Sequence, residues 1–512
     1  MGRSGQKSIA FTVVIAVVLS LAGKFLAFFK DIVLASFFGA GVETDAYFIA
    51  NLVPGLIWLA IFTTISATFL PQYVKLKHSG SGEETLFTQQ AVRLYFYLAL
   101  FLTVVCFIFA KEIVQISAPS APPPTQELAT FLTRIMILGF SATGYVGLQN
   151  ALQQANARFV APLAVPVTNN VIMILAIVAA GYLQNIAIAV AGAVLAWVLQ
   201  APIQRWQTRH IYSWQWDWRV EEQTWKRLSL LSVPIALAVF LDQLNIFIGI
   251  TIASGFGPGA ISHLNYASRL ALFAAGLFSW LVSYFFFPSL ADNAAKGDDV
   301  ANGQLLTRGL SIILLTTAPI AALGLAGRTE IVTLIYGRGA FTQSDVVETA
   351  MVFGFYGLGI IFISMREMLN RTFFSYQKTV TPLLIGVGAA IVNLTVSLIL
   401  SRQIGVSGIA LGAATGALFF SVLQLWLLRR WKPILIQSRL ALMFAVSVSA
   451  SALAYGVARL FLEQIADWHF FTRLCLMSFV ALTIYLISAI LLLRMGGIRL
   501  GTLRNLFTGA AQ

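Results

Sequence analysis

The chain alternates between long apolar blocks and short polar connections. Each block is about 20 residues or longer, the length that a helix needs to cross the roughly 30 Å hydrocarbon core of a bilayer. A spanning helix also satisfies its own backbone hydrogen bonds. The pattern therefore predicts an all-α polytopic membrane protein with fourteen transmembrane helices. The predicted helices cover residues 9–38, 44–74, 86–116, 127–155, 160–182, 186–206, 226–254, 261–290, 304–326, 344–375, 380–401, 406–430, 436–462 and 470–494.

Composition supports a membrane location and gives an orientation. The chain is 58% hydrophobic and 10% charged, whereas a soluble protein carries about 25% charged residues. The net charge of +13 could suggest a nucleic-acid partner, but its distribution does not. With the N-terminus in the cytoplasm, twenty lysines and arginines lie in the predicted cytoplasmic segments and six lie outside. This bias follows the positive-inside rule and predicts that both termini are cytoplasmic, with the first helix retained.

Short matches recur at a nearly constant spacing, which indicates an internal duplication. "ASFFGAG" at 35–41 returns as "ASGFGPG" at 253–259, and "APLA" at 161–164 returns as "TPLL" at 381–384. Six helices per copy is an even number, so both copies enter the membrane in the same direction, an arrangement found in transporters. The predicted parts are a first six-helix repeat at 1–206, a cytoplasmic linker at 207–225, a second repeat at 226–430, and two appended helices with a tail at 431–512.

Three charges interrupt the first predicted helix. Lys24, Lys30 and Asp31 lie within a segment of membrane-like hydrophobicity. A charge at bilayer depth costs a few kcal/mol or more, so it should face protein or a water-filled cavity. Such cations could meet an anionic substrate. The alternative is structural: Lys30 pairs with Asp31 or Asp45, or extends to the membrane interface.

Several motifs resemble the MurJ (MviN) family, whose members flip lipid II, the undecaprenyl-pyrophosphate-linked peptidoglycan precursor, across the bacterial cytoplasmic membrane. The resemblance implies a fourteen-helix flippase fold, a role in cell-wall synthesis and cell shape, and a polyprenyl-diphosphate-linked glycan as partner. It also implies that Lys24, Lys30, Asp31 and Arg269 bind the substrate. The motifs are "KFLAFFKDIVLASFFGAGVETDAYFIANLVP" (24–54), "NYASRLALF" (265–273), "FFFPSLA" (285–291), "LIYGRGAFTQSD" (334–345) and "FFSYQKTVTP" (373–382).

The chain departs from the family pattern in two places. Family members usually have arginine where this chain has Lys24 and Lys30, and lysine lacks the planar fork that binds phosphate bidentately. They also commonly carry an arginine pair and a glutamate in the second helix, where this chain has Trp58 and Leu59 and no acid. These departures leave open another lipid-linked glycan, such as an exopolysaccharide repeat unit, as the substrate.

The remaining polar residues inside the predicted helices indicate at most a binding site for a cation that drives transport. Asp242 and Asn393 could bind a cation in the second repeat, or they could form hydrogen bonds between helices. The sequence shows no nucleophile–base arrangement, phosphate loop or metal-ligand spacing. Cys106 and Cys475 both lie in apolar runs and do not suggest a disulfide. We therefore expect neither an enzyme nor a cofactor or structural metal.

Two other classes of function compete with the flippase. A cation-coupled exporter of small amphiphilic molecules would share this architecture, but it usually has twelve helices and uses carboxylates to bind cationic cargo. The third class is a non-transporting scaffold that recruits cell-envelope enzymes. Its only support is that Trp58 and Leu59 replace the family's arginine pair. The intramembrane cations favour an anionic lipid-linked substrate over both.

Overall fold

The protein is helical throughout the part that the computed structural model describes, residues 3–80, 82–212, 221–465 and 468–495, and these residues form no strand. Eleven described helices are long and apolar enough to cross a membrane, or twelve when one bent pair counts as a single span. Helices also occupy the two remaining predicted segments. The all-α polytopic class is therefore confirmed, while the count of fourteen spans stays a prediction.

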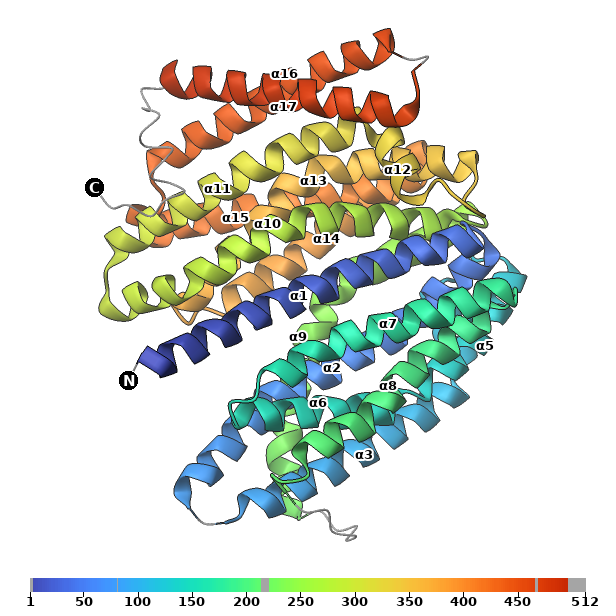
Figure 1. Ribbon diagram of the computed structural model, residues 1–512, viewed down its shortest axis with the longest axis vertical. Coiled ribbons are helices and arrows are strands. Elements are labelled where there is room, and N and C mark those ends of the chain that lie inside the picture. Colours follow the sequence, from blue (N-terminus) through green and yellow to red (C-terminus); the bar gives the residue numbers. More distant parts are fainter. Residues whose placement is uncertain (1–2, 81, 213–220, 466–467, 496–512) are drawn as a thin grey trace. The chain divides into compact units, whose positions relative to one another are not determined.

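The helices group into two compact units. The first comprises Met1–Ser262 together with Gly339–Phe341. Within it, α1 packs against α7, α2 packs against α5, α6 and α9, and α7 packs against α8 (Figure 1). Its helices are α1 (Arg3–Phe38), α2 (Val42–Ser79), α3 (Glu84–Ile108), α4 (Ala110–Ser117), α5 (Pro123–Ile137), α6 (Phe140–Ala155), α7 (Val160–Tyr182), α8 (Ile186–Thr208), α9 (Glu222–Ala253) and the short η1 (Ser254–Phe256).

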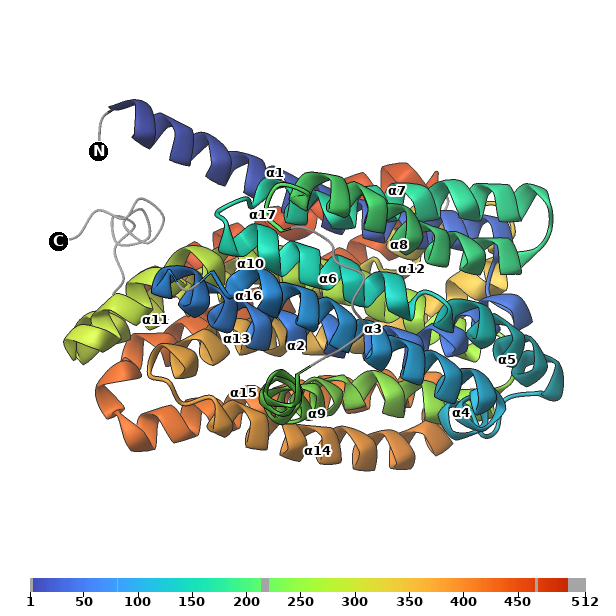
Figure 2. The ribbon, with the colours of Figure 1, turned by 90° about the horizontal axis from the view of Figure 1, so that it is seen from below.

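The second unit comprises His263–Arg338 and Thr342–Gln512. Within it, α14 packs against α15, α11 packs against α13 and α16, and α16 packs against α17 (Figure 2). Its helices are α10 (Ala260–Lys296, whose first three residues belong to the first unit), α11 (Asp299–Ala326), α12 (Arg328–Tyr336), α13 (Gln343–Ser375), α14 (Val380–Ile404), α15 (Val406–Trp431), η2 (Pro433–Leu435), α16 (Ser438–Gln464) and α17 (Phe470–Met495).

The packing units do not end where the predicted repeats end. Helix α9 opens the predicted second repeat, yet it packs with the first unit, against α2. Residues 213–220 of the predicted linker and 496–512 of the predicted tail lie outside the described residues. The predicted repeats are duplicated stretches of sequence, and the units are defined by packing. The units therefore do not test the repeat boundaries, which stay a prediction.

The turns after α6 and α13 have the same backbone geometry. Ala157, after α6, and Gln377, after α13, have φ of 57° and 59°. In each turn the next backbone amide donates to the carbonyl five residues earlier, at 2.9 Å after α6 and 3.0 Å after α13. Positive φ is uncommon outside glycine, and the offset of 220 (377 minus 157) equals that of the nearby "APLA" and "TPLL" segments (381 minus 161).

Two predicted spans are broken into helix pairs. The span predicted at 86–116 consists of α3 and α4, which meet at Phe109. The span predicted at 127–155 consists of α5 and α6, which are bent by 43°. At that bend a Cβ on Gly139 would lie 3.2 Å from the Trp58 ring, so glycine allows the ring to approach the backbone. Helix α5 begins at Pro123, earlier than predicted, because proline is well suited to the first turn of a helix.

Buried amides hold α6 and α8 together. Gln153 Nε2 donates to Gln204 Oε1, and Thr208 Oγ1 donates to Gln149 Oε1 at 2.6 Å. All four side chains are buried. Helices in lipid gain little from apolar contact alone, so such hydrogen bonds help to fix their pairing.

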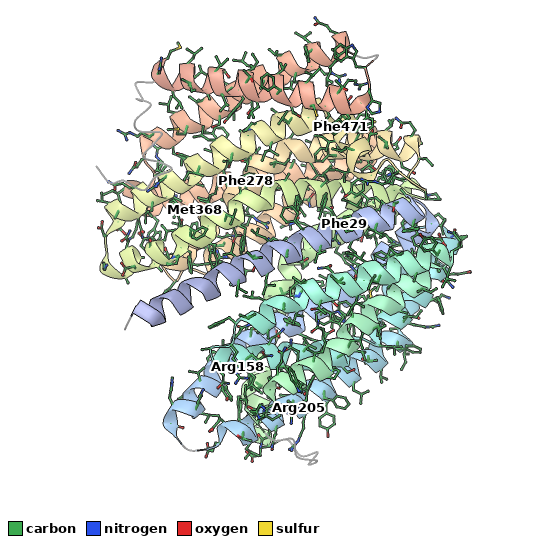
Figure 3. All side chains as sticks on the ribbon, in the orientation of Figure 1. Phe29, Arg158, Arg205, Phe278, Met368 and Phe471 are labelled. Atoms are coloured by element: carbon green, nitrogen blue, oxygen red, sulfur yellow. The ribbon has the colours of Figure 1, made fainter. Side chains whose placement is uncertain are left out.

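Two arginines lie at the same end of the first unit (Figure 3). Arg158 Nη1 donates to the carbonyl of Gln207 at 3.1 Å. The Arg205 guanidinium lies 4.6 Å from the centre of the Tyr212 ring and donates to the Tyr212 carbonyl at 3.3 Å. These cations therefore have structural partners that connect α8 to its neighbours.

Candidate functional site

The lysines of α1 occupy different environments. Lys24 is exposed, whereas Lys30 and Asp31 are buried. Lys30 Nζ lies 3.2 Å from Asp31 Oδ1, so the two form an ion pair. Six residues along a helix correspond to a rotation of about 120°, which places Lys24 and Lys30 on different faces. The structural alternative for Lys30 is thus observed, and Lys24 is the better candidate for contact with a substrate.

We expect the ion pair to support stability. Lys30→Ala leaves Asp31 buried without the Lys30 cation, and breaking a buried pair in this way costs about 3–5 kcal/mol. The melting temperature of the purified protein should therefore fall. The double variant Lys30→Ala/Asp31→Asn removes both charges and should recover most of the loss. A double variant no more stable than Lys30→Ala would contradict the structural role.

Arg269 lies on α10 in the second unit and is half-buried. Lys24 belongs to the first unit. That these two cations bind one diphosphate stays a prediction.

Asp45 forms a hydrogen-bonded cluster with the first turn of α10. Its carboxylate accepts from the backbone amides of Gly259 and Ser262, both at 2.7 Å, and from Ser262 Oγ at 2.6 Å. Ser262 Oγ also lies 2.8 Å from Thr44 Oγ1, and while its single proton serves Asp45 it can accept from the Thr44 hydroxyl. A carboxylate at a helix N-terminus satisfies amides that have no partner within the helix and interacts favourably with the helix dipole. Asp45 therefore joins the start of α2 to the start of α10.

This hydrogen-bonded cluster, Thr44, Asp45, Gly259 and Ser262, was missed by sequence reasoning, which considered Asp45 only as a partner for Lys30. One signal was present: Thr44 and Ser262 are 218 residues apart (262 minus 44), the spacing of the repeat. The two hydroxyls that meet would therefore be at equivalent positions of the two predicted copies.

A second close contact explains the glycines of two motifs. The backbone amide of Ala340 donates to the Ser36 carbonyl at 2.8 Å. Gly39 and Gly339 have φ of 61° and 63°, and a Cβ on either would lie 2.5 Å or less from a backbone oxygen. Only glycine fits both the backbone conformation and the space. The "FGAG" and "GRGAF" segments therefore have a structural role in joining the end of α1 to the loop after α12.

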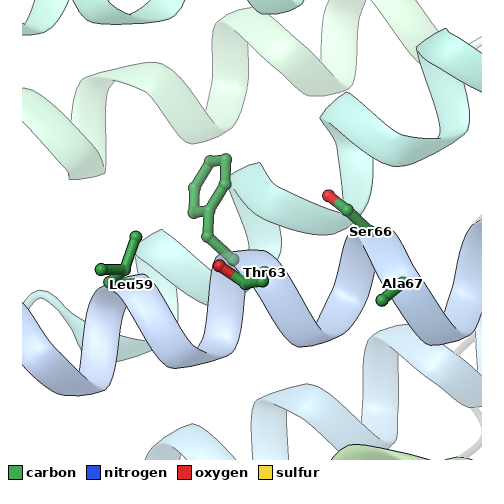
Figure 4. A pocket seen from close by; sticks show the side chains of 5 residues that line it. Leu59, Thr63, Ser66 and Ala67 are labelled. Atoms are coloured by element: carbon green, nitrogen blue, oxygen red, sulfur yellow. The ribbon is translucent and has the colours of Figure 1, made fainter. Parts of the chain in front are cut away.

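Trp58 and Leu59 occupy the positions where the family resemblance predicted arginines. Trp58 belongs to an aromatic wall, and Leu59 lines a pocket. Trp58 packs against Trp197 of α8 and Phe140 of α6, with ring centres 5.8 Å and 6.5 Å away. Leu59, the next residue, is 42% exposed. It lines a pocket of about 520 Å³ with Phe62, Thr63, Ser66 and Ala67 (Figure 4).

The predicted cation site is not tested by the described residues. Asn393 is buried, and its Oδ1 accepts from Ser397 Oγ at 3.0 Å. Asp242 lies in α9, but its side chain is outside the described residues. Among the residues that the structure describes, no cluster of three His, Cys, Asp or Glu side chains could hold a metal ion. Joint binding of a cation by Asp242 and Asn393 stays a prediction.

Helix α13 also carries charges within its membrane segment. Arg371 pairs with Glu367 at 3.1 Å, one turn away. The Arg366 guanidinium lies 5.5 Å from the centre of the Phe420 ring. The described partner of Glu367 is thus Arg371, at the i,i+4 spacing that favours ion pairs.

The fold and these residues can be compared with known proteins. The family model described as "Lipid II flippase MurJ" matches residues 34–480. The chain belongs to the MurJ family. The resemblance in the motifs is therefore confirmed. A lipid II flippase MurJ of Burkholderia cenocepacia is 28% identical over 412 residues, covering 78% of this chain and 80% of that protein.

Solved structures agree on the fold. A lipid II flippase MurJ in an inward closed conformation has a TM-score of 0.82 at 20% identity, covering 94% of this chain and 99% of that one. An inward-facing multidrug transporter of the MATE family has a TM-score of 0.66 at 12% identity, covering 82% and 98%. A drug exporter thus shares this fold, as the sequence suggested.

Proposed function

We propose that the chain exports lipid II, a polyprenyl-diphosphate-linked peptidoglycan precursor, across the bacterial cytoplasmic membrane by alternating access. The observation that carries this proposal is the family match over 34–480. The intramembrane cations agree with it chemically. A diphosphate headgroup carries negative charge, and Lys24 on α1 offers an exposed cation within a membrane helix.

The proposed activity moves a lipid without making or breaking a covalent bond. It therefore requires no nucleophile, general base or redox cofactor. A coupling cation bound by Asp242 and Asn393 would be a further component, with Asn393 supplying an amide oxygen.

Rescue of cells depleted of their own lipid II flippase tests the proposal. Expression of this chain should restore growth and cell shape, and the variant Lys24→Ala should not. Rescue failure at normal protein level would contradict lipid II export. It would then favour the second candidate, a flippase for another polyprenyl-diphosphate-linked glycan, which the uncharged pocket at Leu59 supports.

The proposed orientation has both termini in the cytoplasm. It is supported by the excess of lysine and arginine in alternate connections. A reporter fused at Gln437 should read cytoplasmic, and one fused at Gly257 should read external. An external reading at Gln437 would contradict this orientation.

A further inference from the structure

The pocket on α2 has a chemistry of its own. Leu59, Thr63 and Ala67 follow one another at intervals of four residues and so share a face of the helix. All three are exposed, and Phe62 and Ser66 complete the lining (Figure 4). The pocket has a volume of about 520 Å³ and is largely open, so a ligand bound there would be only partly enclosed. None of the five lining residues is charged, so the pocket cannot neutralise a phosphate.

The two hydroxyls of the pocket are free to bind a ligand. Within the described part of the chain, neither Thr63 Oγ1 nor Ser66 Oγ forms a hydrogen bond. A hydroxyl in a helix commonly donates to the carbonyl one turn back. Thr68, on the same helix, does this with the Thr64 carbonyl at 2.8 Å. Thr63 and Ser66 instead present open hydrogen-bonding groups beside apolar side chains.

We infer that this pocket binds an uncharged sugar residue of the transported glycan. The inference rests on the proposed function and adds a specificity site to it. A sugar ring combines an apolar C–H face, which suits Leu59 and Phe62, with hydroxyls, which suit Thr63 and Ser66. A prenyl chain would leave both hydroxyls without partners, and a diphosphate requires cations.

The aromatic wall behind the pocket supports this assignment. Trp58 is held between Phe140 and Trp197, and Phe62 also contacts Trp197, with ring centres 5.8 Å apart. These contacts fix the side-chain directions on α2. The chain thus has an uncharged surface where the family resemblance predicted two arginines. This surface binds the sugar rather than the phosphate.

Binding of two lipids to the purified full-length protein in nanodiscs tests the inference. One lipid is undecaprenyl diphosphate, and the other is the same lipid bearing an uncharged disaccharide. Two hydrogen bonds of ordinary strength should make the sugar-bearing lipid bind about tenfold more tightly to the unmodified protein. The variant Thr63→Val/Ser66→Ala should lose most of this difference and still bind undecaprenyl diphosphate normally, which also shows that it is folded.

Thr103→Val on α3 is the matched control, because its hydroxyl already donates to the Ala99 carbonyl at 2.7 Å. It should leave the preference for the sugar-bearing lipid unchanged. Equal binding of both lipids to the unmodified protein, or an unchanged preference in the double variant, overturns the sugar site and leaves the flippase proposal standing. Binding of neither lipid to the unmodified protein overturns both.

Discussion

Lys24→Ala should abolish export while leaving the amount of folded protein and its melting temperature nearly unchanged. Lys24 is exposed and lies away from the buried Lys30–Asp31 pair. A charge-assisted hydrogen bond to phosphate contributes about 1.5–3 kcal/mol, so its loss should weaken diphosphate binding roughly ten- to a hundredfold. Rescue of flippase-depleted cells measures export, and thermal unfolding of the purified protein measures stability.

Lys24→Arg is the matched control, because it keeps the charge and adds the fork that family members usually have. It should retain export. A large fall in folded protein for Lys24→Ala would show instead that Lys24 has a structural role. Full export by Lys24→Ala would remove Lys24 from the substrate site.

Asp45→Ala should lower the melting temperature and strongly reduce export. The change removes the acceptor of two backbone amides and the Ser262 hydroxyl in a buried setting. Leaving such donors unpaired costs about 1–3 kcal/mol each, so we expect a total loss of roughly 3 kcal/mol or more. Export should suffer because the cluster fixes the start of α2 against the start of α10.

Ser262→Ala provides the graded comparison. It removes the hydroxyl but keeps both backbone amides on Asp45, so its effect should be about 1 kcal/mol. Asp45→Asn should fall between the two, because an amide oxygen still accepts hydrogen bonds without the charge. Equal stability of Asp45→Ala and the unmodified protein would refute the role of the cluster.

The hydrophobic pattern predicted where helices lie, because a bilayer leaves few alternatives to a continuous helix. It did not predict that α3 ends at Phe109 or that α5 and α6 are bent, since these breaks depend on neighbouring helices rather than on local hydropathy. The Gly139 bend is an example: the backbone there lies against the Trp58 ring, more than 80 residues away in the sequence (139 minus 58 is 81).

The candidate site could be predicted only in part. Local spacing correctly offered Asp31 as a partner for Lys30. The Asp45 cluster joins residues more than 200 positions apart, and no local pattern reveals such a contact. The sequence showed that Trp58 and Leu59 replace arginines, but only packing shows that Trp58 turns toward Trp197 while Leu59 lines a pocket.

Lipid transport in vesicles reconstituted with the purified protein tests lipid II export most directly. Lipid II is placed in the inner leaflet, and its arrival in the outer leaflet is followed with a reagent that cannot cross the membrane. We expect arrival well above that in protein-free vesicles, and a return to the protein-free level with Lys24→Ala. Arrival no faster than in protein-free vesicles, for lipid II and for other undecaprenyl-diphosphate glycans alike, would show that the protein is not a flippase for these lipids.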